Sequence, residues 1–144
     1  MIAVDTNILV YAAIASAPHH REARSLLAAL AAAPEPWAIP WPCCYEFLRV
    51  VTHPRVYHPP LPLPVGRAFL AALFSSPSLL LLSETARHHE AMQAVLGESG
   101  VAGNLVHDAH IVALCREHGV DELLTCDKDF LRFRVPRSRH PFVG

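Results

Sequence analysis

The chain has 144 residues, the size of one ordinary domain, and 52% of them are apolar while only 17% are charged. This composition is that of a folded chain and excludes a disordered one. The 12 basic and 13 acidic residues nearly cancel, so the chain lacks the excess positive charge that is typical of nucleic-acid-binding proteins. We therefore expect one domain over residues 1–144, in which metal ions or a second subunit would offset phosphate repulsion if the partner is RNA. No apolar run approaches the ~20 residues that span a bilayer, so we expect a cytoplasmic protein with no membrane partner.

The first predicted elements alternate between strand and helix. Residues 2–4 are apolar and end at Asp5, a residue type that caps helices by accepting backbone N–H bonds. Between Pro18 and Pro34, apolar residues recur with the spacing of one helix face. Residues 37–39 then have the composition of a second strand.

Residues 43–52 form the next predicted helix. Its apolar stripe leaves Glu46 and Arg49 on a different, more polar side, so Glu46 is not expected in the core. The segment 54–64 is dense in proline and cannot form a regular helix or an inner strand. We interpret it as a connector between two helices within the same domain.

The second half repeats the alternation. A helix is predicted from Val65, a strand over the four leucines 79–82, a helix that begins at Ser83 and Glu84, a helix over 104–118 and a strand over 123–125. The four consecutive leucines predict a strand that is buried on both faces. Alternating short strands and helices predict an α/β fold, a three-layer sandwich with a central parallel sheet of four to five strands and helices on both faces.

Four acidic residues lie at ends of predicted elements. Asp5 follows the first strand, Asp127 follows the last clear strand, Asp108 is in the first turn of its helix, and Glu46 is one turn into another. Each has an ordinary structural explanation as a cap, a turn former or a solvated residue. Together, however, they lie at the ends of elements that are expected to meet at one edge of the sheet, so their side chains are expected to lie close to one another.

Converging carboxylates repel one another unless protons or a divalent cation neutralise them. Oxygen-rich sites select hard ions such as Mg²⁺ or Mn²⁺, which activate water and stabilise charge in phosphoryl displacement. The predicted reaction is hydrolysis of a phosphodiester. A zinc site is not favoured, because His19-His20 and His88-His89 are sequence neighbours without the spacing that brings two ring nitrogens together from one helix face.

Four segments carry a resemblance to a known family: MIAVDTNILVYA at 1–12, EFLRVVTHPRV at 46–56, GNLVHDAHIVAL at 103–114 and LLTCDKDF at 123–130. Together they resemble the PIN-domain toxins of VapBC toxin–antitoxin systems, over nearly the whole chain. The resemblance implies a PIN-like fold and endonucleolytic RNA cleavage that depends on Mg²⁺ or Mn²⁺. It also implies a homodimer and a cognate VapB-type antitoxin whose tail covers the active site.

The resemblance also assigns roles to residues. The four acidic positions of the family, which bind the metal and act in catalysis, match Asp5, Glu46, Asp108 and Asp127. Accessory roles fall to Thr6 or Asn7, which would support the first acid, and to Asp129.

Two other functions remain open. A phosphatase or phosphotransfer domain also places acids at strand ends, but a haloacid-dehalogenase-like phosphatase would have a second acid where Asn7 stands. A PIN-like module that binds RNA without cutting it is the other alternative, and metal-dependent turnover would separate it from a nuclease.

Basic and aromatic residues are candidates for RNA contact, with an ordinary solvated surface as the alternative. The aromatic candidates, which could equally be core or interface residues, are Trp41 and Tyr57. The basic candidates are Arg49, Arg55, His58, Arg132, Arg134, Arg137 and Arg139. The sequence leaves open which RNA is cleaved, which antitoxin binds and whether one or two ions act.

Overall fold

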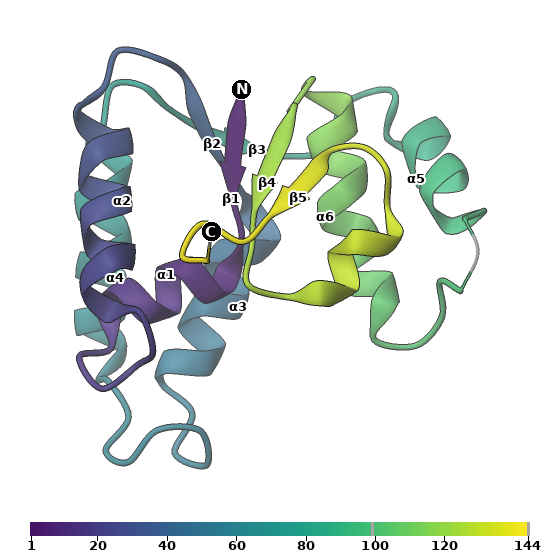
Figure 1. Cartoon of the computed structure of the whole chain (residues 1–144). Coiled ribbons are helices and arrows are strands. Elements are labelled where there is room, and N and C mark those ends of the chain that lie inside the picture. Colours follow the sequence, from purple (N-terminus) through teal and green to yellow (C-terminus); the bar gives the residue numbers. More distant parts are fainter. Residues whose placement is uncertain (99, 144) are drawn as a thin grey trace.

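The computed structural model describes residues 1–98 and 100–143. Its elements alternate along the chain and build one sheet with flanking helices (Figure 1). In chain order they are β1 Ile2–Val4, α1 Thr6–Ala13, α2 His20–Ala32, β2 Trp37–Pro40, α3 Trp41–Val51, α4 Leu63–Phe74, β3 Leu79–Leu82, α5 His88–Leu96, α6 Leu105–Glu117, β4 Glu122–Leu124, the 3₁₀ helix η1 Lys128–Arg132 and β5 Arg137–Arg139.

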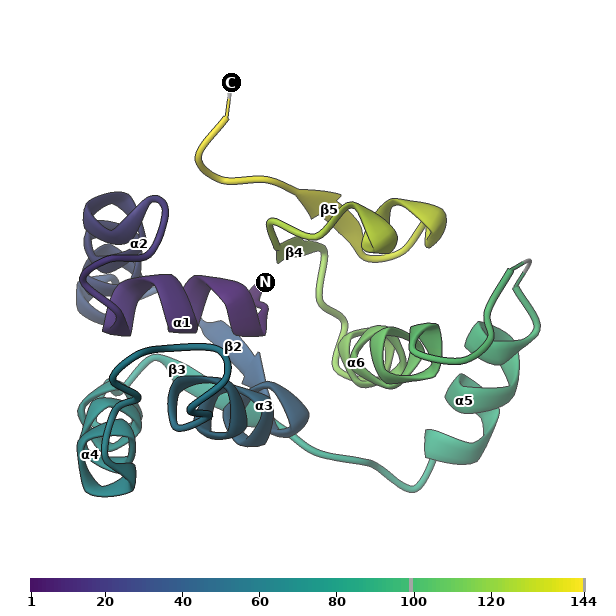
Figure 2. The ribbon, with the colours of Figure 1, turned by 90° about the horizontal axis from the view of Figure 1, so that it is seen from below.

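The sheet has the strand order β3-β2-β1-β4-β5, and all of its pairings are parallel. Seen from below, α1 and α2 lie on one side of the sheet, and α5 and α6 lie on the other (Figure 2). The predicted α/β sandwich with a parallel sheet is therefore confirmed. The strand order reverses direction between β1 and β4, and in open parallel sheets ligands bind at this point, outside the carboxyl ends of the strands.

The central strands form the middle of the hydrophobic core. Ala3 and Val4 of β1, Ile39 of β2 and Leu123 and Leu124 of β4 are all fully buried. Because β1 is covered on both faces, the segment that follows it has little freedom, and Asp5 is fixed at the sheet edge. Among the described residues, no helix is long and apolar enough to cross a membrane.

The structure corrects the expectation for the four leucines of β3. Leu80 is 48% exposed, whereas burial on both faces was predicted. The reason is the position of β3 at the edge of the sheet, beyond β2, where the helices cover it incompletely. A run of apolar residues cannot distinguish an inner parallel strand from an edge strand.

The start of α5 also differs from the prediction. The helix begins at His88, and Ser83 and Glu84 lie in the non-helical connection that precedes it. The carboxylate of Glu117 on α6 accepts hydrogen bonds from both the backbone N–H and the hydroxyl of Thr85, at 2.9 and 2.8 Å. These contacts from a distant helix anchor the connection at Thr85 and explain why the local helix-start signal is overridden.

Candidate active site

Asp5 occupies the centre of the site. It follows β1 directly, is only 4% exposed, and its backbone N–H bonds to the carbonyl of Leu124 on β4 at 3.0 Å. Its Oδ1 accepts the backbone N–H of Thr6 at 2.7 Å, and its Oδ2 accepts the hydroxyl of Thr125 at 2.7 Å. Each carboxylate oxygen is thus held by a hydrogen bond, from α1 to Oδ1 and from the residue after β4 to Oδ2. The side chain lies at the point where the strand order reverses.

The segment after β4 is held beside Asp5 by hydrogen bonds to two side chains, those of Thr125 and Asn7. The backbone N–H of Asp127 bonds to the hydroxyl of Thr125 at 3.0 Å, and the backbone N–H of Cys126 bonds to Oδ1 of Asn7 at 3.3 Å. Asp127 in turn caps η1 by accepting the backbone N–H of Asp129 at 2.8 Å. Asn7 therefore supports the segment that carries Asp127, while the backbone of Thr6 supports Asp5.

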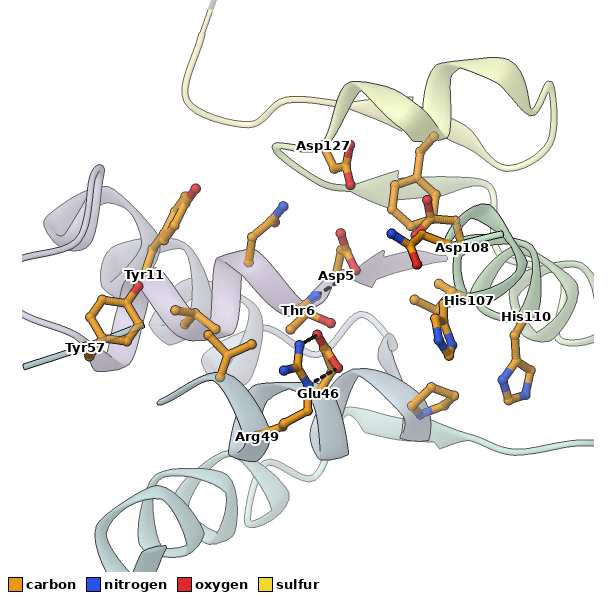
Figure 3. Close-up of a pocket in the computed structure, with 17 residues that line it drawn as sticks. Asp5, Thr6, Tyr11, Glu46, Arg49, Tyr57, His107, Asp108, His110 and Asp127 are labelled. Atoms are coloured by element: carbon orange, nitrogen blue, oxygen red, sulfur yellow. Dashed lines mark hydrogen bonds and ion pairs between the residues drawn. The ribbon is translucent and has the colours of Figure 1, made fainter. Parts of the chain in front are cut away.

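Asp108 approaches the same place from the first turn of α6. Carboxylate oxygens of Asp108, Asp127 and Asp129 lie within 4.8 Å of one another, a spacing at which three ligands could hold one metal ion. Asp5, Asp108 and Asp127 line one cleft of about 630 Å³. Figure 3 shows these three side chains directed toward a common space.

Glu46 faces this cleft from α3, but its carboxylate is already engaged. Arg49, one turn further along the helix, donates from Nη2 to Oε1 at 2.6 Å and from Nε to Oε2 at 3.0 Å (Figure 3). The guanidinium hydrogen bond lowers the pKa of Glu46. Glu46 is exposed, as predicted, and the structure places it across the cleft rather than inside the group of three aspartates.

The electrostatics of the site favour a cation. Burial raises the pKa of Asp5, and the charge of Asp127 adds to this shift. The pKa of Asp108 is raised to about 6, first by burial and then by the neighbouring charges of Asp127, Asp5 and Asp129. Several carboxylates therefore share a space in which their negative charges are mutually unfavourable, and a divalent cation would relieve this repulsion.

The donor set fits a hard divalent ion. The side chains that converge offer carboxylate oxygens, which suit Mg²⁺ or Mn²⁺ better than softer metals. The rest of the cleft is lined in part by His107, Asn104, Tyr11 and Tyr57. Tyr57 belongs to the proline-rich connector, so this connector forms one wall of the site.

Thr125, the last residue of the strand predicted over 123–125, contacts two of the candidate acids although no role was predicted for it. Its hydroxyl donates to Asp5 and accepts from the backbone of Asp127, so a single side chain orients both acids. A polar Thr two residues before an Asp, directly after a buried strand, was the available signal.

If Asp5 binds the metal of an RNA-cleaving enzyme, as the resemblance implies, we expect Thr125→Val to lower the rate of RNA cleavage by about 10- to 100-fold. This is the range typical when a group that orients a metal ligand is lost. Valine matches the shape of threonine but leaves the buried Oδ2 of Asp5 without its hydrogen bond, which should also lower the free energy of unfolding by about 1–3 kcal/mol. Steady-state cleavage rates and urea unfolding would measure both effects. Thr125→Ser keeps the hydroxyl and should retain most activity, and equal losses in both variants would contradict the hydroxyl's role.

Three of the basic candidates can be placed relative to the cleft. Arg137 and Arg139 on β5 both pair with Glu122 at the start of β4, which is the end of the sheet opposite the cleft. Arg49 lines the cleft, as does Tyr57. Trp41 packs instead against Phe74 of α4, with ring centroids 5.7 Å apart.

A family model described as PIN domain matches residues 2–136. The chain therefore belongs to the PIN-domain family, whose fold and acidic cleft the preceding observations describe. Within that family it is a VapC-type member. It is 34% identical to Ribonuclease VapC48 of Mycobacterium tuberculosis over 140 residues, which cover 97% of each chain. It is also 35% identical to VapC ribonuclease Mb2897 of Mycobacterium bovis over 144 residues, 100% of this chain and 97% of the relative.

Solved structures agree on the fold. Mycobacterium tuberculosis VapC20, described as a sarcin–ricin loop cleaving toxin, superimposes with a TM-score of 0.67 at 19% identity and covers 91% of this chain and 93% of its own. A VapBC2 structure from Rickettsia felis, bound to a DNA fragment from its promoter, gives a TM-score of 0.69 at 21% identity, with 96% and 98% coverage. At these identities the superpositions support the shared PIN-like architecture.

Proposed function

We propose that this protein is an endoribonuclease that hydrolyses RNA phosphodiester bonds with Mg²⁺ or Mn²⁺. The observation that carries the proposal is the convergence of Asp5, Asp108 and Asp127, from three separate elements, where the strand order reverses. The names of its full-length relatives, which are VapC ribonucleases, support the same activity. A bound divalent ion would supply charge neutralisation and water activation for an in-line displacement at phosphorus.

In this proposal Asp5, Asp108 and Asp127 hold the metal, and Asp129 is an accessory acid beside them. Thr6, Asn7 and Thr125 orient the acids through the hydrogen bonds described above. Glu46 is the fourth acid, and it acts only when Arg49 releases it. That release would leave a guanidinium at the cleft where an RNA phosphate could bind it.

We further propose that the nuclease is a growth-inhibiting toxin and works in the cytoplasm as one PIN domain. A VapB-type antitoxin would neutralise it, and the active form would be a homodimer. Support comes from relatives named VapC and from the solved VapBC2 complex of similar fold. The cleft itself is compatible with inhibition, because a peptide with a basic side chain would satisfy its unpaired acidic charge.

The first experiment is an RNA cleavage assay with purified protein and labelled total RNA, with Mg²⁺, with Mn²⁺ and with chelator. We expect cleavage with either ion, none with chelator, and none from a folded Asp5→Asn variant. Cleavage that persists in chelator, or in the Asp5→Asn variant, would refute the metal-dependent mechanism. Absence of cleavage under every ion would favour the non-catalytic RNA-binding module, whereas release of phosphate from small phosphoesters would favour a phosphatase.

A further inference from the structure

A second group of metal-binding side chains lies outside the three-aspartate cluster. It consists of Glu84, His88 and His110, whose potential ligand atoms all lie within 4.8 Å of one another. Oε1 of Glu84 is 2.7 Å from Nε2 of His110, and the two imidazole rings have centroids 5.6 Å apart at an interplanar angle of 65°. Two imidazoles and a carboxylate thus face one another across the junction of α5 and α6.

These ligands come from three different parts of the structure, although Glu84 and His88 are only four residues apart in the sequence. Glu84 is in the connection after β3, His88 is the first residue of α5, and His110 is in the first half of α6. The spacing rule applied to the sequence asks only whether two histidines share one helix face, which the neighbours His88 and His89 do not. It could not detect a site whose histidines belong to two packed helices.

A buried carboxylate orients one of the histidines. Oε2 of Glu117 lies 2.7 Å from Nδ1 of His88, and the side chain of Glu117 is only 1% exposed. Glu117 is itself fixed by the backbone N–H and the hydroxyl of Thr85. This bond occupies Nδ1, so Nε2 is the nitrogen of His88 that remains available to a metal ion. A carboxylate bonded to the other ring nitrogen is the arrangement commonly found behind metal-bound imidazoles.

We propose that Glu84, His88 and His110 form a Zn²⁺ site, with Glu117 as the residue that orients His88. Two imidazoles and one carboxylate are a donor set that zinc accepts, and a water would complete its tetrahedral coordination. Mg²⁺ prefers oxygen ligands, so the aspartate cleft and this group would select different ions. The ordinary alternative is that the histidines only form ion pairs with Glu84 and Glu117, without a metal. An exposed ion pair such as Glu84–His110 contributes little to stability by itself.

The position of this site gives it a structural role. A small cavity of about 380 Å³, lined in part by Glu84, His88, His107 and His110, adjoins the catalytic cleft, which His107 and His110 also line. His110 is two residues from Asp108 on the same helix (Figure 3). Zinc would join the connection before α5 to the helix that carries Asp108, and would thereby hold that acid in position without entering the reaction.

The test is a titration of Zn²⁺ into the full-length, chelator-stripped protein in the presence of excess Mg²⁺. We expect one Zn²⁺ per chain, a rise in Tm on binding, at least about tenfold weaker binding for Glu84→Gln, and still weaker binding for His110→Gln. Both substituted side chains are on the surface, so these variants should fold. Chelator competition and differential scanning calorimetry measure affinity and stability without any assay of RNA cleavage.

Two controls separate this site from its surroundings. His89→Gln removes an exposed histidine next to His88 that is not part of the group, and should bind Zn²⁺ like the unmodified protein. Asp127→Asn disrupts the proposed catalytic site and should also leave Zn²⁺ binding unchanged, so failure of the nuclease proposal would not affect this result. Absence of Zn²⁺ binding, equal binding by His110→Gln, or loss of binding in Asp127→Asn would each overturn the inference.

Discussion

Asp108→Asn is expected to abolish RNA cleavage while making the metal-free protein more stable. The loss of activity should be about 100-fold or more, because losing even one preorganised electrostatic contact at a reacting centre costs about 10²- to 10³-fold. The gain in stability follows from the raised pKa of Asp108, since burial and the charges of Asp127 and Asp5 disfavour its ionised form at neutral pH. Asparagine has nearly the same shape and carries no charge.

The opposite signs of these two effects make the prediction specific. Cleavage rates with Mg²⁺ and thermal unfolding in chelator should be measured on the same preparation. Glu35→Gln is the matched control, because Glu35 is exposed before β2, at the far end of the sheet, and neither quantity should change. A variant that loses both activity and stability would show that Asp108 is a structural residue, and a variant that keeps its activity would remove Asp108 from the proposed metal site.

Metal affinity is expected to depend steeply on pH. Asp108 must lose its proton before it can bind a cation, so affinity for Mn²⁺ should fall by about tenfold for each pH unit below the pKa of about 6. The stability of the metal-free protein should change in the opposite direction. A raised pKa means that the folded state binds the proton of Asp108 more tightly than the unfolded state. The contribution of Asp108 to stability is therefore fully present below its ordinary pKa of 3.8 and is lost as pH rises through about 6.

Calorimetric titration with Mn²⁺ and urea unfolding in chelator, each at several pH values on both sides of 6, would test these two trends. The Asp108→Asn protein should lack the Asp108 part of both dependences, so the difference between the two proteins isolates it. A residual slope should remain, because the pKa of Asp5 is raised by burial and the pKa values of Glu46 and Glu122 are lowered. Metal affinity that is independent of pH in the unmodified protein would mean that Asp108 is ionised throughout and that its neighbours do not repel it as the structure indicates.

Much of this fold followed from local patterns in the sequence. The strands β1, β2 and β4 were predicted from short apolar runs, and α6 was predicted because its apolar stripe ends at Gly119. The edge position of the acids followed from the same patterns, since residues after parallel strands meet at one edge of a sheet. The strand β5 was not identified, because Arg137–Arg139 is polar and is stabilised by ion pairs with Glu122.

The alternation of strands and helices follows from the order of the amino acids alone, as does the position of Asp5, Asp108 and Asp127 at the ends of elements. Which side chains meet depends on the folded arrangement of those elements. Thr125 bonds to Asp5 across 120 residues, and His88 and His110 face each other from two helices. Whether a segment forms a helix or a strand depends largely on residues a few positions apart, and their pattern can be seen in a single sequence. Which side chains come into contact depends on how distant elements pack against one another, and a local sequence pattern does not contain that information.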